Sequence, residues 1–426
     1  MFSSLSLLAM IVFMAGYLQA GNIEVGTKST TTLKVTESSY TILGLSNTLS
    51  GIEFMQVKTK EGYFTHFRIN EYGYSTEEGN PRLPVIKKLI EVPLGAICLA
   101  ELLSYEVEEV NLADYGITDL VMPAQPSLSK GVDNPDDVEF VYNPSTYAQD
   151  AFWGPEMINV VDLGVIRGVR MARLEIAPVY YNPVKNTLKV YTNIEVKVNF
   201  TGGNIGETMA QKESMFSPHY AAIYGQLINY KPLGGFKDFI TDEPPTYIIV
   251  ADPMFEDALS PFIEWKTKKG FLVVEAYTDD PLVGSTTTSI KNYLQDFYDN
   301  PPEGYNAQSY VLFVGDDDQI PAFDGSAGYH ITDLYYCTYD GTADIYPDCY
   351  YGRFSANNLD ELQPQIDKTL EYEQYLFPDP SFLDQVVMVA GADNTFAATY
   401  GNGQINYGTE NYFNLSHGLT SHTYLQ

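Results

Sequence analysis

Acidic residues follow two apolar segments of the kind that form buried strands. The acidic run 316–318 comes directly after the segment 310–314, and Asp393 comes shortly after the segment 385–390. In open α/β sheets, functional residues gather just beyond the carboxyl ends of the strands. These carboxylates could therefore share one crevice, although a Gly-Asp pair after a strand is also ordinary turn chemistry.

A second acidic stretch, 340–348, contains Asp340, Asp344 and Asp348. It offers alternating carboxylates and carbonyls on a curved loop, and Ca²⁺ takes oxygen ligands of this kind. The spacing is not that of an EF-hand. The residues alone leave two interpretations open, a calcium site and a solvated acidic loop.

A search for a catalytic nucleophile finds none of the common motifs. The sequence has no G-x-S-x-G elbow, no H-E-x-x-H string and no phosphate loop. Cys337 and Cys349 are predicted to be buried small hydrophobes, with pairing in an oxidising compartment as the alternative. Neighbouring carboxylates disfavour a nucleophilic thiolate there. His417, before Gly418, is predicted to be a surface or helix C-cap residue.

Composition limits the classes of function that this chain can have. A length of 426 residues favours two or three domains, and the formal net charge of −31 repels phosphate backbones. We therefore expect no nucleic-acid partner. Residues 1–20 carry no charge and contain an apolar stretch of signal-peptide length; a membrane anchor is the alternative. No later segment is apolar enough to span a bilayer, so a secreted or cell-surface protein is expected.

The texture of the chain changes twice. Residues 21–205 alternate apolar and polar side chains with period two, which predicts a β-rich, sandwich-like domain. Residues 206–244 are rich in Gly and Pro and predict a linker, with a short helix near 218–230. Residues 245–426 alternate apolar strands with amphipathic helices, which predicts an incomplete, doubly wound, mainly parallel sheet. Its strands are expected at 247–251, 271–275, 310–314 and 385–390.

Specific strings in the second part resemble the gingipain-like cysteine peptidases, peptidase family C25. They lie at 262–270, 310–316, 320–321, 351–355 and 365–373. More generic strings upstream resemble the prodomain of the same family. They lie at 79–85, 92–95 and 178–183.

The resemblance implies a signal peptide, a β-rich inhibitory prodomain and a caspase-like α/β peptidase domain. Its members hydrolyse peptide bonds with a His from a Gly-His-Gly string and a later Cys. The Gly-His-Gly string does not occur in this sequence, and neither does a Cys after it. Residues 1–426 are therefore expected to lack the catalytic His and Cys and to be inactive alone. The prodomain would act as an intramolecular inhibitor until the chain is cut within 205–245, and the substrates would be proteins or peptides.

The resemblance also assigns roles to particular residues. Asp393 matches the carboxylate that orients the catalytic His, with a capping Asp as the alternative. Asn406 falls where arginine-specific members place an Asp, and an amide cannot pair with a cationic side chain in the same way. A structural calcium site is implied at Asp316, the carbonyl of Asp340, Asp344, the carbonyl of Tyr346, and Asp348. There Asp348 replaces a glutamate, and one residue is inserted near Ala343.

Two other functions are compatible with these residues. One is a non-catalytic, calcium-stabilised surface or adhesion protein derived from the peptidase fold. The other is a processing peptidase of the same family that acts in protein secretion rather than digestion.

Overall fold

The computed structural model describes residues 20–127, 138–232, 244–326, 330–341, 344–391 and 401–425. The expected signal peptide and Asp393 therefore lie outside the described residues, apart from Ala20. In the described ranges, every helix is too short or too polar to cross a membrane.

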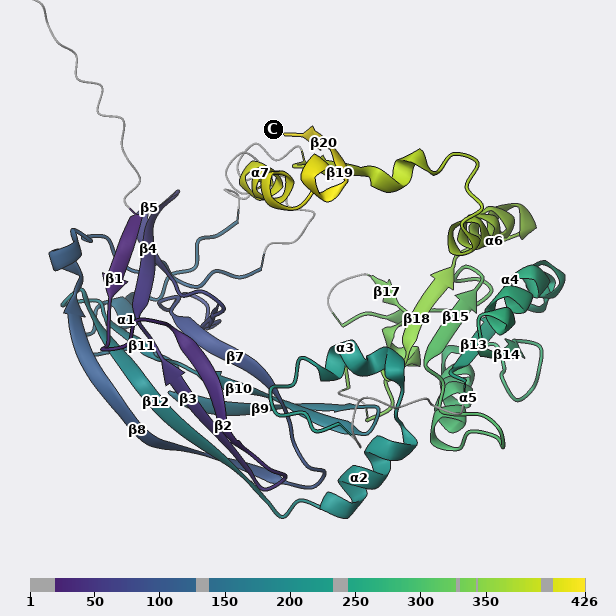
Figure 1. Cartoon of the computed structure of the whole chain (residues 1–426), viewed down its shortest axis with the longest axis horizontal. Helices are drawn as coiled ribbons and strands as arrows, with labels where there is room; N and C mark the ends of the chain where they lie inside the picture. Colours follow the sequence, from purple (N-terminus) through teal and green to yellow (C-terminus); the bar gives the residue numbers. More distant parts are fainter. Residues whose placement is uncertain are drawn as a thin grey trace, which may run out of the picture.

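The N-terminal part consists of three antiparallel sheets (Figure 1). The largest has the order β11-β12-β3-β2, and β8 lies along the other side of β12. Its strands are β2 (Thr32–Ser38), β3 (Ile42–Thr48), β8 (Ile97–Asn111), β11 (Val179–Asn182) and β12 (Thr187–Thr201). The second, β6-β7-β10-β9, consists of β6 (Gly73–Tyr74), β7 (Pro84–Glu91), β9 (Ile158–Ile166) and β10 (Val169–Ile176). The third, β1-β4-β5, consists of β1 (Ala20–Glu24), β4 (Gly51–Thr59) and β5 (Gly62–Arg68).

The predicted period-two pattern is clearest in β12. Its burial alternates along the strand, and Leu188, Val190, Ile194 and Val198 are each 0% exposed. Such alternation places one row of side chains in the core and the next toward solvent. Apolar residues of β3 and β12 meet those of β7 and β10 in one core, which gives the predicted sandwich-like packing. The short helices η1 (Leu112–Tyr115) and α1 (Pro144–Tyr147) complete this part.

The segment predicted as a linker carries α2 (Ile205–Ser214), η3 (Pro218–Tyr220) and α3 (Ala221–Tyr224). Its described residues pack on the β-rich part. Lys212 Nζ donates to Glu91 Oε1 at 2.6 Å, and the two side chains are 1% and 3% exposed. The segment up to residue 232 is therefore fixed to the β-rich part by a buried ion pair.

The second part contains a four-stranded parallel sheet of order β14-β13-β15-β18. Its strands are β13 (Thr246–Ala251), β14 (Leu272–Tyr277), β15 (Tyr310–Val314) and β18 (Tyr350–Phe354). Helices α4 (Glu256–Lys268) and α6 (Leu359–Gln374) pack on one face, and α5 (Thr287–Asp299) packs on the other. The smaller elements are η4 (Pro253–Phe255), β16 (Phe323–Asp324), β17 (Ile331–Thr332), η5 (Leu334–Tyr336) and η6 (Pro380–Asp384).

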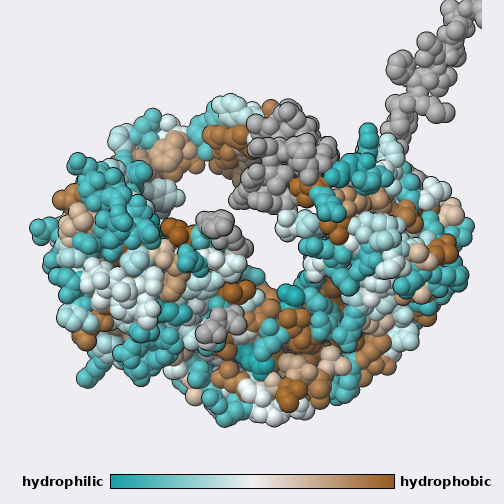
Figure 2. Space-filling view, turned by 180° about the vertical axis from the view of Figure 1, so that it is seen from behind, coloured by the Kyte–Doolittle hydropathy of each residue, from teal (hydrophilic) through white to brown (hydrophobic). Residues whose placement is uncertain are grey.

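The prediction that 385–390 forms a buried strand of this sheet was wrong. Instead, β19 (Gln385–Val389) pairs in parallel with β20 (Thr420–Tyr424) in a separate two-stranded sheet, and Val387 is 65% exposed. Helices α7 (Asn402–Asn411) and η8 (Leu415–His417) accompany it. The fourth position in the main sheet belongs to β18, a partly exposed edge strand whose Gly and Arg interrupt the apolar pattern expected of a buried strand. Figure 1 shows this C-terminal unit apart from the main sheet, and Figure 2 shows an opening through the molecule.

Candidate functional site

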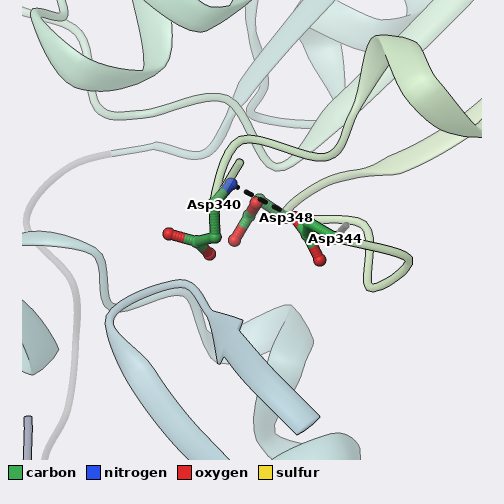
Figure 3. Close-up of side chains that lie close together, drawn as sticks. All are labelled: Asp340, Asp344 and Asp348. Carbon is green, nitrogen blue, oxygen red and sulfur yellow. Dashed lines mark hydrogen bonds between the residues drawn. The ribbon is translucent and has the colours of Figure 1, made fainter. Parts of the chain in front are cut away.

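Three of the residues predicted to bind calcium lie together on the loop between η5 and β18, although Asp340 was predicted to bind through its main-chain carbonyl. Asp340, Asp344 and Asp348 each offer a carboxylate oxygen, and these oxygens lie within 4.8 Å of one another. Figure 3 shows the three side chains next to one another on this loop, here called the acidic loop, 340–348. The structure therefore brings together side chains that are spaced by four residues along the chain.

Main-chain amides hold two of these carboxylates in place. Asp344 accepts from the amide of Asp340 at 3.2 Å and from the amide of Tyr346 at 2.9 Å. Asp348 Oδ2 accepts from the amide of Tyr339 at 3.2 Å. The bond from Tyr346 to Asp344 is that of an Asx turn, and the other two bonds tie the carboxylates of Asp344 and Asp348 to the main chain at residues 340 and 339.

The electrostatics of the cluster disfavour three negative charges. Burial, with the charges of Asp340 and Asp344, raises the pKa of Asp348 to about 7, although the amide of Arg167 opposes the shift. Partial burial, beside Asp344 and Asp299, raises the pKa of Asp340 to about 6. Neighbouring carboxylates repel one another when all of them are ionised. A bound cation would offset this repulsion and favour the ionised forms.

The donor set fits one hard cation. Ca²⁺ binds oxygens at about 2.3–2.6 Å, so ligands on opposite sides of one ion are about 4.8 Å apart. The three carboxylates meet that spacing. Tyr346 lies on the same loop, and its amide donates to the carboxylate of Asp344.

Asp316 lies at the other edge of the sheet. It follows the carboxyl end of β15, where its oxygens accept from Ser355 Oγ and Asn357 Nδ2 at 3.0 Å. The acidic loop precedes the amino end of β18, so the length of that strand separates them by about 13 Å at 3.3 Å per residue. The structure therefore gathers the three aspartates of the acidic loop and leaves Asp316 apart from them. Hydrogen bonds from Ser355 and the Asp317 amide lower the pKa of Asp316.

Sequence reasoning missed Arg167, which connects the two parts of the chain. Its side chain is 1% exposed. The guanidinium donates to the carbonyls of Gln308 at 2.7 Å, Asp348 at 3.1 Å, Ala307 at 3.3 Å and Met215 at 3.0 Å. Its amide donates to Asp348 Oδ1 at 2.9 Å. An Arg-Gly pair between two alternating strands signals a turn but gives no sign of such contacts.

The two cysteines near the acidic loop are buried. Cys337 and Cys349 are both 0% exposed and belong to the apolar cluster between α5 and the sheet. Burial raises the pKa of the Cys337 thiol well above its ordinary value. Both are unpaired thiols, which agrees with their predicted place as small buried hydrophobes rather than nucleophiles.

The remaining predicted site residues are not brought to the acidic loop. Asn406 lies exposed on α7, and its carbonyl accepts from Thr409 Oγ1 at 3.1 Å. Asp393 lies outside the described residues. His417 is the exposed last residue of η8, which confirms its predicted surface position, and Gly418 after it is the C-cap in the left-handed conformation.

Comparisons with known proteins agree with the order of the two parts. The family model Propeptide_C25 matches residues 25–231, and the model described as Peptidase family C25 matches residues 240–424. Lys-gingipain of Porphyromonas gingivalis is 37% identical over 410 residues, which is 95% of this chain and 23% of that protein. Gingipain R1 of the same organism is 27% identical over 365 residues, 84% of this chain and 35% of that protein.

A solved structure, "Structural insight into zymogenic latency of gingipain K from Porphyromonas gingivalis", covers 43% of this chain at 39% identity, with a TM-score of 0.41; the match covers 100% of that structure's chain. The chain belongs to peptidase family C25, with the propeptide region followed by the N-terminal part of the peptidase region. It spans about a quarter of the length of the Lys-gingipain that it matches (23%).

Proposed function

We propose that this chain is the N-terminal portion of a secreted or surface-bound precursor of a gingipain-like cysteine endopeptidase. The observation that carries the proposal is the order of the two family matches, propeptide and then peptidase, along one chain. The buried contacts of Arg167 support it, because they join the two parts as an inhibitor joins its enzyme. The second part would be the beginning of a caspase-like domain.

The reaction would be attack of a thiolate on a peptide carbonyl, with a His as general base and acid. Residues 1–426 contain no Gly-His-Gly string, and Cys337 and Cys349 are buried. The chain on its own would therefore supply positioning groups only. Asp393 would hold the imidazole of the His in the correct tautomer, and Asn406 would contribute to substrate selection without favouring arginine.

Calcium would be structural in this protein. Asp340, Asp344 and Asp348 would hold it, and the ion would neutralise their charges and fix the acidic loop before β18. Asp316 would not take part, because it lies at the opposite end of β18. The raised pKa values of Asp340 and Asp348 support this assignment.

The peptidase proposal is tested by expressing residues 20–426 and a longer product of the same gene. Each is incubated with calcium and peptide substrates, with and without a thiol-alkylating reagent. The longer product, once cut between its two parts, should show cleavage that the reagent abolishes, and residues 20–426 should show none. Thiol-sensitive turnover by residues 20–426 alone would contradict the assignment of the missing dyad.

The calcium proposal is tested by titrating the chelator-treated protein with Ca²⁺ in a calorimeter. Asp344→Asn should weaken binding at least about tenfold, because it removes one of three charges from the cluster. The matched control is Asp316→Asn, which should bind Ca²⁺ as the parent does. Equal losses in both variants would place the ion elsewhere.

The absence of a Gly-His-Gly string within residues 1–426 also supports a second candidate, a non-catalytic calcium-stabilised surface protein. The coding sequence after Gln426 separates the two. A Gly-His-Gly string followed by a Cys supports the peptidase, and a stop codon directly after Gln426 supports the surface protein.

A further inference from the structure

Arg167 occupies the tip of the hairpin between β9 and β10. Ile166 pairs with Val169, so Arg167 and Gly168 form a two-residue turn, with φ of 47° and 73°. Positive φ at both positions is the type I′ geometry, which matches the twist of the flanking strands. Hairpin tips usually face solvent, yet this side chain is 1% exposed. It is buried between Met215 and Tyr220, within the propeptide match, and Ala307, Gln308 and Asp348 of the part that follows that match.

The receiving groups form a socket at the amino ends of β15 and β18. The carbonyls of Ala307 and Gln308 precede β15, and the carbonyl of Asp348 precedes β18. Three carbonyls on one guanidinium match the fan of donors that arginine presents and that lysine lacks. The rings of Tyr298 and Tyr220 lie 5.6 and 5.2 Å from the guanidinium carbon. Aromatic faces at such distances favour a cation.

Aromatic and hydroxyl contacts surround this socket. Ser217 Oγ lies 2.9 Å from Ser309 Oγ, and both residues are buried. The hydroxyl of Tyr350 donates to the carbonyl of His219 at 3.2 Å, and its ring lies 4.7 Å from that of Tyr220. A buried arginine inside a rim of tyrosines is the arrangement that dominates binding energy at protein interfaces.

The socket lies at the edge of the sheet opposite to the one expected for catalysis. Functional groups of open α/β sheets gather beyond the carboxyl ends of the strands, where Asp316 follows β15. Ala307 and Asp348 lie beyond the amino ends of β15 and β18 instead. The prodomain can therefore contact the amino ends of the strands whether or not a peptide segment binds at their carboxyl ends.

We propose that this socket is an arginine-binding anchoring site, which holds the prodomain by Arg167 at the edge remote from catalysis. Because α2 and α3 also remain with the prodomain, the anchor persists after the chain is cut beyond residue 231. This proposal takes only one point from the proposed function, namely that the chain is cut between its two parts. Its test measures association and needs no peptidase activity, so the two can fail separately.

The experiment uses the precursor with a specific protease site introduced between residues 231 and 244 and an affinity tag on the prodomain. After cleavage, the complex is immobilised and the release of the second part is followed with time. Arg167→Ala should release it at least about 30-fold faster, which converts to about 2 kcal/mol. Arg167→Lys should lie between, because a single ammonium nitrogen cannot span carbonyls that contact two separate nitrogens of the guanidinium. The matched control is Arg68→Ala, whose side chain is 55% exposed.

A second measurement separates an anchor from a merely misfolded hairpin. Release from the Arg167→Ala complex is repeated in low-millimolar methylguanidinium and, separately, in methylammonium. Methylguanidinium should slow the release by filling the vacated socket, and methylammonium should not. The proposal is overturned if Arg167→Ala releases within twofold of the parent. It is equally overturned if release is fast but neither cation slows it, because the socket would then not select a guanidinium.

Discussion

One buried or partly buried arginine lies at each end of the parallel strands, and the two arginines differ in their hydrogen-bond partners. At the carboxyl edge, Arg353 of β18 donates to the carbonyls of Gly315 at 2.9 Å and Ile320 at 2.8 Å. It also pairs with Asp333, at 2.9 and 2.6 Å. At the amino edge, Arg167 comes from the other part of the chain. Among the described residues, its guanidinium donates to main-chain carbonyls and forms no ion pair.

This difference separates a permanent contact from a removable one. Removal of Arg353 would leave the carboxylate of Asp333, which is 15% exposed, without its partner. Departure of the hairpin that carries Arg167 would uncover carbonyls, which water can solvate, and would release one main-chain amide contact from Asp348. Uncompensated buried charge costs far more than an exposed carbonyl. The amino edge is therefore suited to a prodomain that leaves, and the carboxyl edge to a fixed structure.

The largest expected effect tests the permanent contact. Arg353→Met should lower the free energy of unfolding of the second part by about 4 kcal/mol, since Asp333, 15% exposed, loses its counter-charge and the carbonyls of Gly315 and Ile320 lose their donor. Urea denaturation of the precursor measures this. Replacing both residues, in Arg353→Met with Asp333→Leu, should recover much of the loss. A change below about 1 kcal/mol in the single variant would show that the pair is not structural.

The next effect concerns the segment that carries Ser217 and Tyr220 to the amino edge. Lys212→Met should destabilise the prodomain by about 3 kcal/mol, because it leaves Glu91 buried and unpaired. Lys268→Met is the matched control, since its pair with Glu264 is exposed at 63% and 67%. That variant should change stability by less than about 0.5 kcal/mol. Equal effects in circular-dichroism melts would contradict the buried clamp.

The acidic loop should make stability depend on pH. The pKa values of Asp348 and Asp340 are raised to about 7 and about 6, above the ordinary value in the unfolded chain. The folded state therefore holds more protons, and its stability falls as the pH rises from about 4 to about 7. In chelator, we expect a loss of about 2 kcal/mol between pH 5 and 8, and saturating Ca²⁺ should abolish it.

Urea titrations at the two pH values, with and without Ca²⁺, measure this dependence. Asp348→Asn should flatten the profile in chelator, because it removes the group with the larger shift. Asp316→Asn should not, because the pKa of Asp316 is lowered rather than raised. A profile that keeps its slope in saturating Ca²⁺ would argue against the metal site.

The smallest effect concerns the rim of the socket. Ser217→Ala leaves the hydroxyl of Ser309 without its partner and should cost about 1 kcal/mol of interface energy. That corresponds to roughly fivefold faster release of the second part from the cut precursor. Ser416→Ala, at an exposed position on η8, should leave the release unchanged. If Ser217→Ala does not change the release rate, the Ser217–Ser309 contact contributes no binding energy and Arg167 carries it instead.

Local patterns predicted the local structure well. The alternation in β12 and the apolar spacing of α5 follow from backbone geometry, which the sequence encodes over a few residues. Helix α6 likewise begins at a local signal, since the side chain of Asn358 accepts from the Glu361 amide at 3.1 Å. The three aspartates of the acidic loop were also found, because they lie within one short segment.

Contacts between distant segments could not be predicted in the same way. The apolar run of β19 gave no information about which sheet it joins, since pairing depends on the path of the chain after α6. Asp316 was grouped with the acidic loop although opposite ends of β18 separate them. Arg167 and Asp348 are 181 residues apart, and neither position has a local signature of the other.

Hydrogen exchange in the intact precursor tests the central claim most directly. The amides of Arg167 and Tyr339 both donate to Asp348, so the segments 163–171, 336–340 and 347–350 should be strongly protected. These segments should lose protection together in Arg167→Ala, while the amides of α6 should stay as protected as in the parent. If the segments 336–340 and 347–350 exchange identically in the parent and the variant, the prodomain is not anchored at the amino edge.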